Sequence, residues 1–278
     1  MPSRKLWKFH SRVAMLLIAC GLLLGGPALA EDKSAATAAV AVEIDRDTKA
    51  MEILLRMANY LAATPSLGVT VLSSYDAIQA NGEYIELGDR RRIELQRPDR
   101  LRVEIERSDG DKGGLVFDGK AVTAYKPADN IYTVIEKTGT VDEVLTYVVK
   151  DLQIPQPLAR LFTATLPQQL EKLVKSIDYV ETNRLLDVPT DHLAARGDEV
   201  DFQIWVAQGD APLPRRVIIT YKNAPGQPQF RAILSDWSMT PVAAGRFAFT
   251  PPADAEKVPL IIPASGLRPS AARKEGAK

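Results

Sequence analysis

Apolar residues recur at every second position through most of residues 69–136, and this period restricts the fold more than any other feature. The stretch RRRIELQRPDRLRVEIE (90–106) shows it most clearly. Its apolar members alternate with charged residues and are Ile93, Leu95, Leu101, Val103 and Ile105. A period of two is typical of a strand with one buried face. Turn sequences such as Asn81-Gly82 and Asp118-Gly119 divide the region into about six antiparallel strands.

Helical periodicity precedes and follows this region. A stripe of apolar residues at 3-and-4 spacing predicts a helix over 45–63. A capping box of Thr140 and Glu143 opens a second helix, and shorter helices are expected near 157–162 and 167–175. These middle segments are interpreted as a helical lid over the sheet.

The strand period returns at Ile177 and continues to Phe249, with RFAFTPP (246–252) expected to close the sheet. A sheet of about 10–12 antiparallel strands is too large to stay flat, so it must curl. The predicted fold class is therefore α+β: a strongly curved antiparallel sheet forming a half-open barrel. An N-terminal helix and the mid-chain lid occupy its concave side, in one domain over residues 45–262. Space that the helices leave unfilled would be an apolar cavity.

The six arginines of residues 90–106 raise the question of a phosphate-binding patch. The alternation places most of them on the solvent face, opposite carboxylates of the next strand. A loop centred on Asp99 would set Leu95 opposite Val103, and Glu94 opposite Glu104. Phosphate affinity needs uncompensated positive charge, so nucleic-acid binding is not expected.

The first thirty residues indicate export. Four basic residues precede a largely apolar run over 13–24, and Ala28-Leu29-Ala30 supplies the small residues of a cleavage site. A run of this length is short of the roughly 20 residues that span a bilayer. Residues 1–30 are thus predicted to be a signal peptide cut near Ala30, which leaves a soluble protein in the periplasm of a Gram-negative bacterium.

A second cleavage pattern overlaps the first. LIAC (17–20), followed by Gly21, is similar to a lipobox, and Cys20 would then carry the lipid anchor of a lipoprotein. A flexible leader over 31–44 and a disordered tail over 263–278 are also expected.

Removal of the signal would change the inventory of reactive residues. The first thirty residues hold four basic and no acidic residues, so 31 Lys and Arg remain against 35 Asp and Glu, a net charge of −4. One histidine (His192) and no cysteine remain. Zinc sites need several His or Cys ligands and thiol catalysis needs a cysteine. The sequence predicts no enzyme, no metal site and no cofactor.

Four short motifs give the chain a family resemblance. They are Arg97-Pro98-Asp99-Arg100-Leu101-Arg102, Phe117-Asp118-Gly119-Lys120, Tyr125-Lys126-Pro127 and the closing run Phe247–Pro252. In this order the chain resembles the bacterial lipoprotein-carrier superfamily (LolA/LolB-like), closest to its predicted periplasmic proteins of unknown function. The resemblance implies a half-open barrel with a helical lid, whose cavity accepts acyl chains or another apolar ligand.

The candidate cavity lining combines inward strand residues with lid residues. The strand candidates are Ile93, Leu95, Leu101, Val103, Phe117, Trp205 and Trp237; the lid candidates are Val144, Leu145, Val148 and Val149. For each the alternative is ordinary core packing. In strand 200–206 the alternation leaves two choices, because Trp205 lies on one face and Phe202, Ile204 and Val206 lie on the other.

The resulting functional hypothesis is a non-enzymatic periplasmic binding or carrier protein, monomeric, that holds a lipid or a lipidated protein. The alternative is a regulatory or scaffold protein that uses the same fold to sense envelope components, with envelope membrane proteins as partners.

Overall fold

Twelve strands form the framework of the protein, whose computed structural model describes residues 47–260. The first six are β1 (Ser66–Ile78), β2 (Tyr84–Gln96), β3 (Arg100–Arg107), β4 (Lys112–Phe117), β5 (Ala121–Lys126) and β6 (Ile131–Glu136). The others are β7 (Ser176–Asn183), β8 (Thr190–Arg196), β9 (Val200–Ala207), β10 (Pro214–Tyr221), β11 (Gln229–Ser238) and β12 (Glu256–Lys257).

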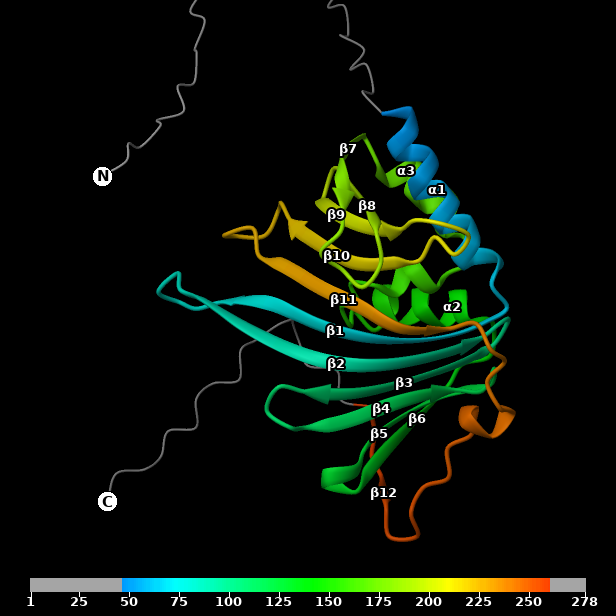
Figure 1. Ribbon diagram of the computed structural model, residues 1–278. Helices are drawn as coiled ribbons and strands as arrows, with labels where there is room; N and C mark the ends of the chain where they lie inside the picture. Colours follow the sequence, from blue (N-terminus) through cyan, green and yellow to red (C-terminus); the bar gives the residue numbers. More distant parts are fainter. Residues whose placement is uncertain (1–46, 261–278) are drawn as a thin grey trace, which may run out of the picture. The chain divides into compact units, whose positions relative to one another are not determined.

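All twelve strands belong to one curved sheet in the order β12-β6-β5-β4-β3-β2-β1-β11-β10-β9-β8-β7 (Figure 1). Each pairing is antiparallel except that of β12 with β6. The edge strands β12 and β7 do not pair with each other, so the sheet stays open. This is the half-open barrel of the predicted fold class.

The helical segments include those predicted at 45–63, from 140, near 157–162 and near 167–175, together with two short turns, at 127–129 and 244–247, that were not predicted. They are α1 (Thr48–Ala63), α2 (Val141–Thr146), the π-helical turn η2 (Tyr147–Asp151), α3 (Leu166–Leu173), and the 3-10 turns η1 (Pro127–Asp129), η3 (Ala159–Phe162) and η4 (Ala244–Phe247). The capping box of α2 is confirmed, because Thr140 accepts from the Glu143 N–H and Glu143 accepts from the Thr140 N–H. Within residues 47–260, no helix has the length and apolar character needed to cross a membrane.

The two faces of the sheet differ in character. The helices α1, α2 and α3 lie on the concave side of the sheet (Figure 1). The apolar side chains of that face pack against them in a single core cluster. Leu95, Leu101 and Phe117 are almost fully buried there. Charged residues gather on the convex face, where Arg90 and Glu106, for example, pair at 3.3 Å.

The pairing of β2 with β3 corrects the register expected from the sequence. The loop consists of residues 97–99 and is centred on Pro98, so Leu95 lies opposite Leu101 instead of Val103. The shift of two residues leaves every side chain on its expected face. It also brings opposite charges into register: Glu94 with Arg102, Arg92 with Glu104, and Arg90 with Glu106. This is more favourable than the expected contact of Glu94 with Glu104.

The expected closing strand over 246–252 is also wrong. The segment begins in the 3-10 turn η4 and then runs across the outer face of the sheet, and the last pairing is the parallel one of β12. Its side chains hold it in place: the Phe249 ring stacks on Tyr125 at 5.0 Å, and Arg246 pairs with Glu94 at 3.0 Å. Pro251 and Pro252 have no N–H to donate to a sheet, which disfavours a strand at this point.

Several predictions of domain organisation lie outside the described residues. These are the signal peptide (1–30) with its cleavage near Ala30, the alternative lipidation of Cys20, the leader (31–44) and the tail (263–278). The residues described here all belong to one compact unit.

Candidate functional site

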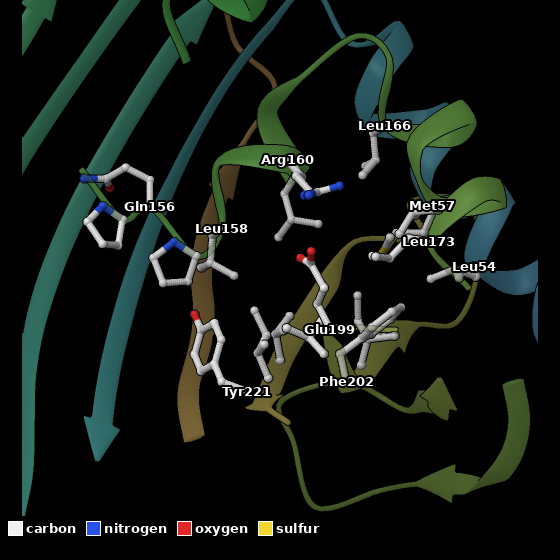
Figure 2. A pocket seen from close by; sticks show the side chains of 18 of the residues that line it. Leu54, Met57, Gln156, Leu158, Arg160, Leu166, Leu173, Glu199, Phe202 and Tyr221 are labelled. Carbon is white, nitrogen blue, oxygen red and sulfur yellow. The ribbon is translucent and has the colours of Figure 1, made fainter. Parts of the chain in front are cut away.

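A cavity of about 590 Å³ lies between the helical segments and the strands β9 and β10. Figure 2 shows its lining, with α1, η3 and α3 on one side and the sheet on the other. The volume is in the range of ligand pockets, roughly 300–1,000 Å³. The cavity is therefore the candidate functional site.

The sheet side of the cavity comes from alternate residues of two paired strands. Phe202 of β9 lies opposite Ile219 of β10, and Ile204 lies opposite Val217. All four line the cavity, because residues two apart in a strand share a face. The floor is thus a two-by-two patch of apolar side chains.

The helical side is equally apolar. Leu54 and Met57 of α1 are fully buried and contact the cavity from the stripe that predicted this helix. The helix α3 adds Leu166, Leu170 and Leu173, which follow its 3-and-4 spacing. The deep part of the cavity therefore offers a ligand no charged group.

The third wall is the lid segment 155–161, whose far end is held by Arg97. The Arg97 guanidinium donates hydrogen bonds to the backbone carbonyls of Thr64 (3.2 Å), Leu61 (3.4 Å) and Phe162 (3.1 Å), and lies 3.5 Å from the Asp142 carboxylate. Burial lowers the pKa of Arg97, and Asp142 opposes this. One side chain therefore joins the end of α1, the end of η3 and the start of α2.

Polar groups are confined to the rim of the cavity. Arg160, Glu199 and Asn223 are exposed, and Gln156 and Tyr221 are partly buried. Burial raises the pKa of the Tyr221 phenol, so the hydroxyl stays protonated and can donate a hydrogen bond. Figure 2 shows Arg160 and Glu199 reaching into the opening from opposite sides.

A second cavity of about 50 Å³ lies further along the concave face, between α2 and the strands β1, β2 and β3. Four of the sequence candidates line it: Ile93, Leu101, Val103 and Leu145. Its polar wall is an ion pair on the concave face. Arg91 donates to Asp89 at 2.7 and 3.0 Å and to the Gln156 side chain of the lid at 2.8 Å, and Ser73 donates to Asp89.

The remaining candidates lie away from both cavities. Leu95, Phe117, Val144 and Val148 are buried in the core cluster, which was the alternative given for them. Val149 is exposed to solvent. Trp237 is half-buried and donates its indole N–H to the Pro214 carbonyl at 3.1 Å.

Trp205 does not face the cavity. The neighbouring positions Phe202 and Ile204 do, so the second of the two choices for this strand is the correct one. Trp205 lies on the convex face, where its ring stacks on His192 with centroids 3.9 Å apart. Arg216 lies 4.8 Å from the same ring. These flat polar groups cover the indole, which explains how a tryptophan on the outer face is almost fully buried.

The sequence reasoning missed most of the larger cavity: the leucines of α3, the lid segment 155–161 and the inward residues of β10. Val217, Ile219 and Tyr221 alternate in RVIITY, so their common face was readable from the sequence. The sequence did not show which strands lie under the lid.

In the part of the chain that the structure describes, no group of three His, Cys, Asp or Glu residues is placed to hold a metal ion.

Comparison with protein families gives a clear match: residues 50–261 match the family described as "Predicted periplasmic protein (DUF2092)". The chain belongs to this family. Membership confirms the expected periplasmic location.

Solved structures of low sequence identity are also similar. LppX, a lipoprotein of Mycobacterium tuberculosis, is 12% identical, with 71% of this chain and 99% of that chain covered and a TM-score of 0.46. A LolA superfamily protein from Nitrosomonas europaea is 12% identical, with 72% and 97% covered and a TM-score of 0.39. The MucA/MucB complex of Pseudomonas aeruginosa gives 15% identity, 76% and 64% coverage and a TM-score of 0.38. Among curated proteins, no relative matches the sequence.

Proposed function

We propose that this protein is a non-enzymatic binding or carrier protein of the periplasm, and that it holds an acyl chain of a lipid or of a lipidated protein in the larger cavity. The observation that carries this proposal is the distribution of polarity around about 590 Å³ of space. The deep walls are leucine, methionine, phenylalanine, isoleucine and valine, and the polar groups lie at the rim.

The chemistry of the deep walls favours an apolar ligand over a polar one. A polar group that enters such a site loses its hydrogen bonds to water and finds no replacement, which costs several kcal/mol. A methylene group gains about 0.8 kcal/mol when it is buried. The same walls therefore reject sugars or peptides of polar residues and accept hydrocarbon.

The volume is compatible with one chain. A water-sized group occupies about 30 Å³, so the cavity has room for roughly 20 such groups. A chain of about twelve carbons would gain on the order of 10 kcal/mol from burial before the costs of association. A carrier must also release its ligand, so a net affinity well below this figure is expected.

The proposal is tested by introducing a larger side chain at a position of β10 that faces the cavity. Ile219 lines the cavity, whereas Ile218 next to it faces the convex side, opposite Arg231 and Gln203. I219W should displace at least two methylenes of the ligand and weaken binding of a fluorescent acyl-chain analogue more than tenfold. I218W introduces the same ring on the other face and should bind the analogue like the wild type.

Native mass spectrometry after mild extraction gives an independent readout. A co-purified acyl-chain ligand in the wild type, lost in I219W and kept in I218W, supports the proposal. Equal binding by the two variants would refute the assignment of the cavity. A wild-type protein that binds no acyl analogue but retains a stable protein partner would favour the regulatory or scaffold alternative instead.

A further inference from the structure

The rim of the larger cavity carries one cation and one anion. Of the described residues that line the cavity, only Arg160 and Glu199 are charged. Neither side chain has an ion-pair partner within residues 47–260, and the two do not pair with each other. They reach into the same opening from η3 and from the turn just before β9 (Figure 2). A ligand at the opening therefore meets both signs of charge at separate points.

An uncharged group of the rim adds hydrogen-bonding capacity beside these charges. The Tyr221 hydroxyl forms no hydrogen bond with any described residue and is available as a donor. Gln156 does not contribute here, because its amide accepts from Arg91 and points away from Arg160 and Glu199 (Figure 2). The Tyr221 hydroxyl can donate to an anionic oxygen.

We propose that the opening selects a zwitterionic head group, a phosphate diester joined to a primary ammonium, as in a phosphoethanolamine lipid. This rests on the proposed function, because the acyl chain fills the cavity while the head group stays at the rim. The phosphate binds Arg160, whose planar guanidinium matches a phosphate with two parallel hydrogen bonds. The ammonium donates to Glu199.

Other head groups fit the rim less well. A purely anionic head group satisfies Arg160 but is repelled by Glu199. A neutral head group displaces water from both charged side chains and forms no charge-assisted hydrogen bond with either of them. The zwitterion matches both, so head-group selectivity should depend on the two residues in different ways.

The experiment measures displacement of a fluorescent acyl-chain probe by three competitors with one lauroyl chain each, all below their micelle concentrations. They are lysophosphatidylethanolamine, lysophosphatidylglycerol and monolauroylglycerol. The wild type should prefer the first. E199Q should lower the affinity for lysophosphatidylethanolamine and raise the affinity for lysophosphatidylglycerol. Each change should be about two- to fivefold, which is the range for an exposed ion pair. R160Q should lower the affinity for both phospholipids and leave the affinity for monolauroylglycerol unchanged.

Two control variants remove charges of the same signs outside the cavity. E52Q and R56Q change exposed residues of α1 that do not line the cavity, and both should leave all three affinities unchanged. Opposite shifts of the two phospholipids in E199Q cannot arise from partial unfolding, which weakens every ligand. Shifts of equal sign, or none, would overturn the head-group proposal while the probe still binds. If the probe does not bind the wild type, the proposed function fails and the head-group proposal fails with it.

Discussion

Replacing Arg97 with alanine tests whether one side chain holds the lid of the cavity in place. Only 15% of the Arg97 side chain is exposed. Its guanidinium donates hydrogen bonds to three backbone carbonyls, which belong to α1, to η3 and to the residue after α1. R97A would leave those carbonyls without their charged donor and Asp142 without its buried counter-ion. The fold should survive, since the strand pairing around residue 97 involves backbone groups.

The size of the effect follows from these contacts. A hydrogen bond from a charged group contributes about 1.5–3 kcal/mol, and breaking a buried ion pair costs about 3–5 kcal/mol. Because part of the guanidinium remains hydrated, we expect R97A to lower the free energy of unfolding by about 3 kcal/mol. For a domain of this size each kcal/mol lowers Tm by about 2–4 °C, so the expected loss is about 6–12 °C.

Thermal melts followed by circular dichroism measure this loss, with R196A as the matched control. Arg196 pairs with Asp178 on the surface, where both side chains are about half exposed. Such a pair contributes about 0–1 kcal/mol, so R196A should melt close to the wild type. Hydrogen exchange in R97A should rise first in residues 141–163. If R97A melts no earlier than R196A, or if exchange rises elsewhere, Arg97 does not hold the lid.

Two further predictions concern local interactions. Burial acts to raise the pKa of Asp76, but hydrogen bonds led by that from Arg231 outweigh it and hold the pKa below its ordinary value. The stabilisation is therefore present at neutral pH and lost as pH falls through the folded-state pKa. D76N should lower the free energy of unfolding in urea by about 1.5 kcal/mol at pH 7, and this difference from the wild type should begin to shrink as pH falls below about 4. A constant difference at every pH would contradict this. T140A removes the cap shared with Glu143 and should cost about 1 kcal/mol, with faster hydrogen exchange in α2. T146A, at the other end of α2, should have less effect, and equal effects would argue against the cap.

The alternation in the sequence was enough to predict the sheet and its two faces, but it could not choose among registers. Pairing Leu95 with Leu101 or with Val103 buries the same residues, because a shift of two keeps every side chain on its face. The difference lies in the cross-strand charges, and these favour the observed register. The closing strand was predicted wrongly for another reason: Phe247 and Phe249 alternate like residues of a strand, yet Phe247 belongs to the turn η4 and the Phe249 ring stacks on Tyr125.

The cavity was harder to predict than the sheet. Alternation showed that Phe202 and Ile204 share a face, and only three-dimensional packing shows which face is inward. The outward choice for Trp205 depends on His192 and Arg216 covering its ring, and neither contact is visible as a pattern. The position of the void depends on how closely the lid approaches the sheet. That approach is set by contacts between distant residues, such as the bond from Arg91 to Gln156, 65 positions apart.

The division of the interior into two cavities has a consequence for ligand length. Gln156 and Leu158 line both spaces, so the partition between them is a piece of the lid, held by the 2.8 Å bond from Arg91. Turning the Gln156 amide away would remove one of the two side chains that separate the smaller space, about 50 Å³, from the larger one. At about 30 Å³ for a water-sized group, this adds room for about two carbons. The longest chain that fits should thus depend on Gln156 and Leu158 together, and longer chains would have to leave their ends at the rim.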